Sequence, residues 1–389
     1  MPMGYRLKWI GNNAGASQIL GINVLYKTRA DIFNLSKSSI ETKIKNSTMS
    51  QMKTVRIVQA GDKFTAEPRD ESRPVPGPRD VLIKVYAASL NYRDTALLRG
   101  EYRAPTKENG IPLSDGAGEV IAVGKDVVRI RKGDRVAVSC VTNWIGGPYS
   151  PEYRSSSVGF TVDGLLAECV VFNEDALARI PDYMSYVEAA SLPCAAVTAW
   201  TALNKVEPLQ PGQTVLIQGT GGVSLFALQF AKIFGARVLA ITSSDGKAAK
   251  LKELGVDAVV NYSNTPDWDR EILALTGGKG VDKVLDIAGE KTIVKSAAST
   301  RITGTVVLIG FASGFGGGLP PIDILVRSLT VTGSTVGSRI EFEAMLQAME
   351  RHQVKPIIDQ VFPFAEFHKA YERLESGQQV GKVVIEIAK

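Results

Sequence analysis

Residues 214–225 read Thr-Val-Leu-Ile-Gln-Gly-Thr-Gly-Gly-Val-Ser-Leu, and this stretch is the strongest indication of the fold class. The apolar run Thr214–Gln218 is typical of a buried strand, and a helical run begins at Leu225. Glycines between a strand and a helix let the backbone approach a pyrophosphate, whose charge the helix N-terminus favours. Ser224 stands where the G-x-G-x-x-G pattern has its third glycine, but its small side chain still permits close helix–strand packing. A purely structural turn is the alternative to the predicted dinucleotide site, which comprises Gly219, Thr220, Gly221, Gly222 and Val223.

Apolar runs alternate with helix-length segments between residues 181 and 336. The runs are Val215–Ile217, Val238–Ile241, Ala258–Val260, Val284–Asp286 and Val306–Ile309. Such runs of Val, Ile and Leu, separated by helices, are typical of a parallel sheet that is covered on both faces. Residues 181–336 are therefore predicted to form an α/β domain, a doubly wound parallel sheet of the Rossmann type.

Residues 52–180 show a different pattern of short β-segments separated by turns. The segments include Val81–Val85, Gly118–Val123 and Asp134–Val138. This pattern predicts a small barrel-like β domain. The amphipathic segment Phe342–Glu350 and the apolar run Lys382–Ile385 are interpreted as a return of residues 337–389 to that first domain.

The residues after the second predicted strand of the parallel sheet indicate which dinucleotide binds. In a site for NAD, an Asp or Glu at this place accepts hydrogen bonds from the ribose 2′-hydroxyl. Here the strand Val238–Ile241 is soon followed by Ser243 and Ser244, with Lys247 shortly after. Hydroxyl donors and an ammonium suit a 2′-phosphate, which a carboxylate would repel, so the sequence favours NADPH. Asp245 is the counter-argument, because a shifted turn could present it to the ribose; its other role would be a helix N-cap.

The composition excludes several classes of protein. The chain has 389 residues, 44% of them hydrophobic and 22% charged, as in an ordinary globular protein of about two domains. The formal net charge of +5 resides in residues 1–48, so the remainder is formally neutral and has no basic stripe for nucleic acid. Neither a membrane-spanning run nor a secretory signal is present, and we expect a cytoplasmic protein.

Residues 1–51 are rich in Ser, Asn and Lys and have little periodic hydrophobicity. We expect a disordered N-terminal extension, and the fold is predicted to begin at about residue 52. A mitochondrial presequence is one alternative, and a true start at Met49 or Met52 is another.

Metal-ligating side chains are scarce. The chain has three cysteines, Cys140, Cys169 and Cys194, and two histidines, His352 and His368, both close to the C-terminus. Three cysteines are too few for a four-cysteine zinc lobe. The two histidines cannot form a helical metal-binding pair such as H-E-x-x-H.

Several linked segments make the chain similar to the medium-chain dehydrogenase/reductase superfamily. Besides the glycine turn, they are residues 77–85, 89–94, 114–120, 132–136 and 192–200, in this order. The resemblance covers residues 52–389. It implies a GroES-like β-barrel catalytic domain interrupted by the Rossmann domain, a small-molecule substrate, and a homodimer formed through the Rossmann domain.

Zinc alcohol dehydrogenases of this superfamily hold their catalytic metal with Cys, His and Cys. Segment matching places Asn91, Ser114 and Cys194 at those positions, and one thiolate without two further good ligands does not retain a zinc. Cys194 is interpreted as a small buried residue at a helix start, and no metal site is expected. The chain thus resembles the zinc-independent branch, which contains quinone oxidoreductases, enoyl reductases and alcohol dehydrogenase-like proteins.

Loss of zinc changes which reactions are easy. Without a Lewis acid, interconversion of simple alcohols and aldehydes loses several kcal/mol of stabilisation, whereas quinones and α,β-unsaturated carbonyls delocalise the incoming electrons themselves. The sequence therefore favours reduction of an activated C=C bond or a quinone by NADPH. An NADP-linked alcohol dehydrogenase without zinc and a non-catalytic NADPH-binding protein are the alternatives.

The segment Asn91–Tyr102 is similar to one in enoyl thioester reductases, where the final tyrosine assists catalysis. Tyr102 is the leading catalytic candidate, as a donor to the developing enolate, and packing against the cleft wall is its alternative role. Asn91 and Thr198 are expected to contact the nicotinamide end, and Asp94 to cap a helix. The further predicted cofactor-binding residues are Tyr262, Gly289, Gly310 and Phe311.

Overall fold

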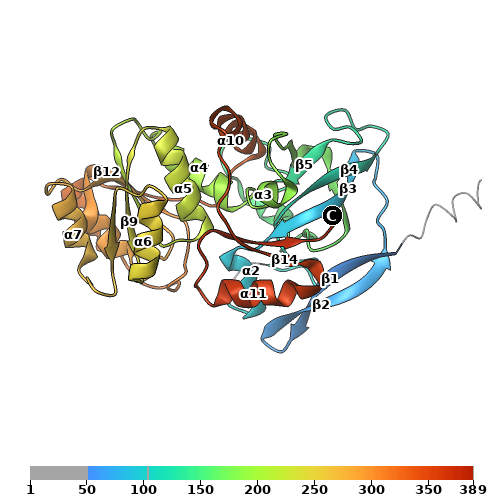
Figure 1. Ribbon diagram of the computed structural model, residues 1–389, viewed down its shortest axis with the longest axis horizontal. Coiled ribbons are helices and arrows are strands. Elements are labelled where there is room, and N and C mark those ends of the chain that lie inside the picture. The colour runs from blue at the N-terminus through green and yellow to red at the C-terminus, as the bar shows by residue number, and fades with distance from the viewer. Residues whose placement is uncertain (1–50, 103–104, 389) are drawn as a thin grey trace, which may run out of the picture. The chain divides into compact units, whose positions relative to one another are not determined.

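The computed structural model describes residues 51–102 and 105–388 (Figure 1). The predicted extension, residues 1–51, lies outside the described residues except for Gln51, which opens strand β1. Over the described ranges, no helix is both long enough and apolar enough to span a membrane.

A parallel sheet carries the glycine turn. Its six strands are β8 (Thr214–Gln218), β9 (Arg237–Thr242), β10 (Ala258–Asn261), β11 (Val281–Asp286), β12 (Thr300–Leu308) and β13 (Thr330–Gly333). They are ordered β10-β9-β8-β11-β12-β13, and all neighbours are parallel. After β10 the chain crosses to the other side of β8, so the switch point lies between β8 and β11, as in a Rossmann sheet. The predicted fold class is confirmed.

Alternation along each strand explains why helices cover both faces of this sheet. Val215 and Ile217 of β8 pack on one face with the core around Phe226, whereas Leu216 packs on the other face with Trp268. The first face is covered by α4 (Ala195–Asn204), α5 (Gly222–Ile233) and α6 (Asp245–Glu253). The second is covered by α7 (Trp268–Leu275) and α8 (Ile293–Ser299), with α9 (Pro321–Arg327) beside α8.

The second large sheet is mostly antiparallel and contains both early and late segments of the chain. Its seven strands are β3 (Asp80–Ser89), β4 (Asp115–Val123), β5 (Arg135–Val138), β6 (Cys169–Asn173), β7 (Leu177–Arg179), β14 (Ile358–Pro363) and β15 (Lys382–Glu386). The late strand β15 pairs with the early strand β3, which brings the C-terminal residues back to the first domain. A separate hairpin is formed by β1 (Gln51–Ala60) and β2 (Lys63–Ser72).

Further helices and 3-10 turns lie along this second part of the chain. They are α2 (Tyr92–Leu98), α3 (Tyr186–Ala190), α10 (Arg339–His352), α11 (Phe367–Glu375) and the 3-10 turns Pro151–Ser156, Glu174–Ala176 and Phe364–Glu366. Helix α2 lies beside α11, and α3 packs on β3 and β4 (Figure 1). The boundaries drawn at 180/181 and 336/337 stay predictions.

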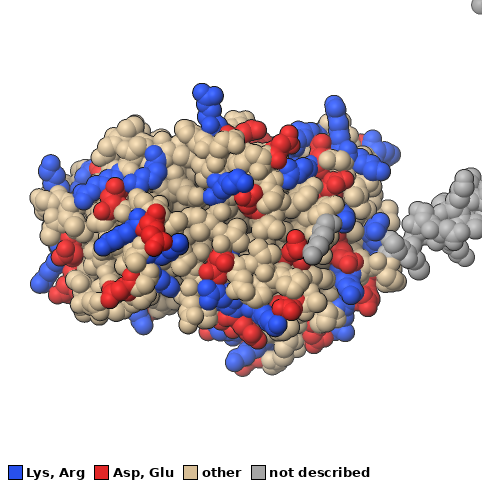
Figure 2. Space-filling view, in the orientation of Figure 1, with Lys and Arg blue, Asp and Glu red and all other residues tan. Residues whose placement is uncertain are grey.

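Charges of both signs are mixed over the face in Figure 2. Surface ion pairs such as Lys232–Asp257 at 2.6 Å and Lys250–Glu253 at 2.9 Å are typical of this mixing. The picture agrees with the formal neutrality of the chain after residue 48.

Candidate functional site

The glycine turn has the geometry that a pyrophosphate site needs. Gly219 has a φ of +75°, and Gly221 is the N-cap residue of α5. A Cβ at either position would meet no atom within 4 Å, so both face open space. At Gly222, by contrast, a Cβ would lie 2.6 Å from Cδ of Lys382. The Ser224 hydroxyl donates to the Gln218 carbonyl at 2.5 Å, which is the close helix–strand packing that the sequence predicted.

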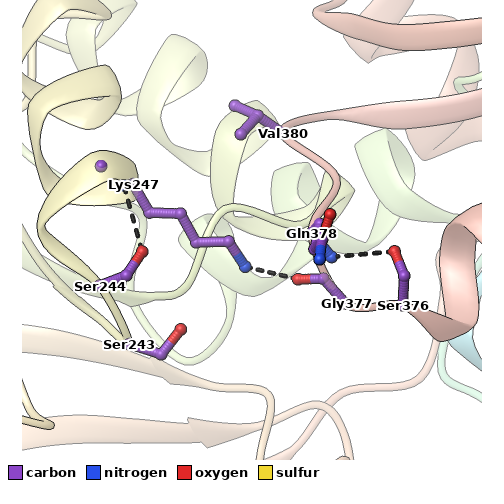
Figure 3. Close-up of a pocket in the computed structure, with 8 residues that line it drawn as sticks. Ser243, Ser244, Lys247, Ser376, Gly377, Gln378 and Val380 are labelled. Atoms are coloured by element: carbon purple, nitrogen blue, oxygen red, sulfur yellow. Dashed lines mark hydrogen bonds between the residues drawn. The ribbon is translucent and has the colours of Figure 1, made fainter.

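An open pocket of about 530 Å³ lies beyond the end of β9 (Figure 3). One wall comes from the turn before α6 and from the first residues of that helix, and the other comes from the segment between α11 and β15. The lining residues are Ser243, Ser244, Gly246, Lys247, Ser376, Gly377, Gln378 and Val380. Lys247 reaches across the pocket and donates to the carbonyl of Gly377 at 2.5 Å. Burial lowers the pKa of Lys247, and the nearby Arg373 lowers it further.

Asp245 is held away from this pocket. Its Oδ1 accepts hydrogen bonds from Nδ2 of Asn261 at 2.7 Å and of Asn264 at 3.3 Å. The N-cap role expected as its alternative belongs instead to Ser244, whose hydroxyl accepts from the Lys247 amide at 3.3 Å. The pocket lining therefore offers hydroxyls and an ammonium but no carboxylate.

A buried carboxylate that the sequence analysis missed organises the switch point. Asp286, fully buried at the end of β11, accepts from the Gly289 amide at 2.9 Å, the Thr292 hydroxyl at 2.7 Å and the Ser296 hydroxyl at 2.6 Å. These bonds fix the loop that carries Gly289. A Cβ at Gly289 would lie 3.0 Å from the carbonyl oxygen of Gly310, so these two predicted cofactor residues are neighbours.

Lys382 joins the start of α2 to the glycine turn. Its buried ammonium donates to the Leu90 carbonyl at 2.7 Å and to Oδ1 of Asn91 at 2.6 Å, and it pairs with Oδ2 of Asp115 at 3.3 Å. An ammonium only donates, so the amide oxygen of Asn91 faces it. Nδ2 of Asn91 is buried and has no hydrogen-bond partner within residues 51–102 and 105–388.

Two cysteines and a carboxylate lie beside this ion pair. The ligand atoms of Asp115, Cys140 and Cys194 all lie within 4.8 Å of one another. Cys140 Sγ donates to Oδ1 of Asp115 at 3.5 Å, and Nη2 of Arg93 approaches the same sulfur at 3.6 Å. Burial raises the pKa of the Cys140 thiol, whereas the hydrogen bond from Cys140 lowers that of Cys194.

This donor set fits a catalytic zinc poorly. Of the three matched positions, Asn91 already gives its oxygen to Lys382, and the Ser114 hydroxyl donates to Asp115 at 2.9 Å. Cys194, the N-cap residue of α4, is the one strong ligand among them. Asp115 and Cys140, which the sequence analysis did not connect with Cys194, already face the cations of Lys382 and Arg93. A divalent ion there would meet two positive side chains.

Aromatic side chains bring the predicted catalytic tyrosine to the Rossmann domain. The ring of Tyr102 lies 4.6 Å from that of Phe160 and 6.0 Å from that of Phe311. Phe311 also meets Tyr92 at 5.7 Å, so the predicted residues Tyr102 and Phe311 are in one cluster. The Arg93 guanidinium lies over Phe160, 4.6 Å from the ring centroid.

The remaining predicted residues flank these clusters. Thr198 is buried on α4, one turn after Cys194. Tyr262 is largely exposed after β10, and its amide donates to the Thr242 carbonyl at 2.9 Å. Asp94 accepts from the Asn91 amide at 2.7 Å, the helix-capping contact, and burial raises the pKa of Asp94 to about 6.

Family models match most of this architecture. Residues 77–182 match an alcohol dehydrogenase GroES-like domain, and residues 222–351 match a zinc-binding dehydrogenase domain. A zinc-type alcohol dehydrogenase-like protein of Schizosaccharomyces pombe is 41% identical over 316 residues, which cover 80% of this chain and 91% of that protein.

Other relatives carry different names. A quinone oxidoreductase of Pseudomonas aeruginosa is 33% identical over 344 residues, covering 86% of this chain and 99% of that protein. The crystal structure of an NAD-dependent alcohol dehydrogenase superimposes with a TM-score of 0.77 at 33% identity, covering 87% of this chain and all of that one. The family is therefore clear from the comparisons, whereas the relatives differ in the reaction that their names give.

Replacing Lys382 by Met tests the buried ion pair. Because the variant leaves the Asp115 carboxylate buried without its cation, we expect the free energy of unfolding to fall by about 3–5 kcal/mol, measured by denaturant titration. Lys369→Met is the control, since the Lys369–Glu366 pair at 3.0 Å is solvent-exposed and should contribute less than about 1 kcal/mol. Equal stability of the Lys382→Met variant and the parent would contradict this account.

Proposed function

Because the chain belongs to the medium-chain dehydrogenase/reductase superfamily and its relatives are named as alcohol dehydrogenases and quinone oxidoreductases, we propose that it reduces a quinone or an activated C=C bond with NADPH, without a catalytic zinc. One observation supports this proposal most strongly. Lys382 pairs with the Asp115 carboxylate and Arg93 contacts the Cys140 thiol, so the groups that could bind a metal already face cations.

The pocket after β9 supports NADPH over NADH. Ser243, Ser244 and Lys247 would hold the 2′-phosphate through hydroxyl donors and one ammonium. Asp245, the one carboxylate in this turn, is engaged by Asn261. Bound NADPH supplies a hydride, and the open glycine turn would receive its pyrophosphate.

Asn91 and Tyr102 would act on the reacting end. Nδ2 of Asn91 has no hydrogen-bond partner among the described residues and would donate to the nicotinamide ribose or carboxamide. Tyr102, held by Phe160 and Phe311, would donate to the acceptor oxygen and relay a proton to the product. An acceptor that delocalises charge needs no Lewis acid for this chemistry.

A Lys247→Ala variant tests the cofactor assignment. Loss of a charge-assisted contact to the 2′-phosphate should weaken NADPH binding about 10- to 100-fold, whereas NADH binding should change little. Fluorescence titration with each dinucleotide measures both constants. Lys250→Ala, on the same helix and paired with Glu253, is the control. An equal loss for NADPH and NADH would argue against a 2′-phosphate site.

The acceptor class is tested with purified full-length protein, using NADPH with a panel of quinones, enones and aldehydes, and NADP⁺ with a panel of alcohols. We expect kcat/KM to be highest for quinones or enones, because no metal polarises an isolated carbonyl. A clear preference for simple aldehydes or alcohols would support the second candidate, an alcohol dehydrogenase, which several relatives are named. Tight NADPH binding with no turnover on any acceptor would support a non-catalytic binding protein instead.

A Tyr102→Phe variant in the same assay tests the role of the Tyr102 hydroxyl. Removing a general acid typically costs about 100-fold or more in kcat, and the ring contacts with Phe160 remain. Unchanged kcat and KM would remove Tyr102 from the mechanism.

We also propose that two chains associate through the β13 edge of the parallel sheet. Strand β13 is the last of the six, and none of the residues of α9 is buried. Ile322, Leu325 and Val326 expose apolar side chains on this helix, and Leu325 is 73% exposed.

A Leu325→Glu variant should shift the protein from dimer to monomer, because a charge at an apolar contact opposes burial. Sedimentation velocity measures the masses. Val128→Glu, at an equally exposed residue outside the six-stranded sheet, should leave the dimer intact. A monomeric parent protein would refute the association.

A further inference from the structure

Arg93 is a largely enclosed cation that lacks an anion. Its Nε is buried and has no hydrogen-bond partner, and the described part of the chain gives it no ion pair within 4.0 Å. Its contacts are the Cys140 sulfur, at 3.6 Å from Nη2, and the face of Phe160. A guanidinium in such surroundings costs free energy unless a ligand pairs with it.

Within the described residues no carboxylate forms an ion pair with this cation, although Asp94 interacts with it electrostatically. Burial raises the pKa of the Cys140 thiol, which favours its neutral form. The hydrogen bond from Cys140 and, to a smaller extent, the charge of Arg93 lower the pKa of Cys194. Asp94 turns Oδ2 to the Asn91 amide, and its Oδ1 has no hydrogen-bond partner in the described part of the chain. Asp115 pairs with Lys382 rather than with Arg93.

The position of Arg93 links it to the proposed chemistry. It lies two residues after Asn91 on α2, and its guanidinium shares the Phe160 ring with Tyr102. The guanidinium therefore lies between the Cys140 sulfur and the Phe160 ring, at the edge of the aromatic cluster. Asn91 and Arg93 are neighbours at the start of α2, and Arg93 and Tyr102 contact the same ring.

We propose that Arg93 is a catalytic residue that binds the carbonyl oxygen of the acceptor and stabilises the negative charge that forms on it. Its guanidinium takes the electrophilic part that a metal plays in zinc enzymes. The inference rests on the proposed reduction of an enone or quinone. It also identifies the acceptor as a carbonyl compound whose oxygen becomes anionic, rather than as an alcohol to be oxidised.

With an enone as acceptor, the hydride that bound NADPH supplies would form a C–H bond at the β-carbon. The C=C pair would then lie between the α-carbon and the carbonyl carbon, and the C=O pair would move to oxygen. Arg93 donates N–H hydrogen bonds to the resulting enolate oxygen. A proton from solvent, relayed by Tyr102, then forms the C–H bond at the α-carbon, which leaves the saturated ketone and NADP⁺.

Substitution of Arg93 by Met tests this role through two opposite effects. Loss of an oxyanion donor should lower kcat by about 100-fold or more, with NADPH affinity unchanged. Removal of an unpaired buried cation should leave Tm equal to or above that of the parent. A structural role for Arg93 would instead lower Tm and NADPH affinity along with kcat, and that result would overturn the proposal.

Chemical rescue provides a second readout. Millimolar methylguanidine should restore at least about tenfold of the lost kcat to an Arg93→Ala variant, because the added cation can occupy the vacated volume. Arg93→Lys, which keeps the charge, should lose less kcat than Arg93→Met. Failure of both, in variants that bind NADPH normally, would overturn the proposal.

Arg99→Met is the matched control, since Arg99 ends the same helix but pairs with Glu101 at 2.8 Å and should not affect kcat. Cys194→Ala tests whether a thiolate is the true partner of Arg93. We expect it to keep its acceptor preference, and a loss of kcat equal to that of Arg93→Met would overturn the proposal. If the parent protein reduces no acceptor, the proposed function fails; if it does and Arg93→Met is equally active, only the role of Arg93 fails.

Discussion

A buried ammonium that uses all three of its protons holds the candidate site together. Lys382 binds the Leu90 carbonyl, the Asn91 amide oxygen and the Asp115 carboxylate, and its methylenes fill the space beside Gly222. Lys382 on β15 therefore contacts three other parts of the fold: the start of α2, the start of β4 and the glycine turn. Because the ammonium orients the Asn91 amide, the amide NH₂ group is left for a ligand. Pairing β15 with β3 is what carries Lys382 to this place.

The electrostatics around this point define the chemistry that is accessible. Two cations and two thiols lie together with the carboxylate of Asp115, which pairs with Lys382, and the buried Asp94 carboxylate interacts with the same cations. Within the described residues, Arg93 contacts a thiol and an aromatic face and its Nε has no hydrogen-bond partner, so it keeps hydrogen-bonding capacity for a ligand. In a site of low dielectric, such fixed donors stabilise a developing anion without reorganising, which is the contribution that a metal makes elsewhere. In the proposed mechanism, the positive charge at the reacting carbonyl comes from side chains, which cannot leave the site as a metal ion can.

The parts of the fold and site that follow local rules were predictable from the sequence. The strand, glycine turn and helix around Gly219 were predicted from their spacing, and Ser224 packs as expected. Tyr102 and Phe311, which were predicted for separate roles, lie next to each other in the structure, and those roles stay predictions. The cluster of Asp115, Cys140 and Cys194 was missed, because its members come from separate segments and share no motif. The second wall of the pocket after β9 was missed for the same reason; it comprises Ser376, Gly377, Gln378 and Val380. From the sequence, Asp286 was interpreted as the last residue of a strand. Its hydrogen bonds to the Gly289 amide and the Thr292 hydroxyl depend on how the following loop folds, so they could not be predicted.

The central claim is that side-chain cations replace a metal at the reacting carbonyl. It is tested most directly by measuring zinc in the purified, active protein and repeating the NADPH oxidation assay after dialysis against a chelator. The account predicts far less than one zinc per chain and unchanged turnover after dialysis. Zinc close to one per chain, with activity that is lost on chelation and restored by added zinc, would contradict it.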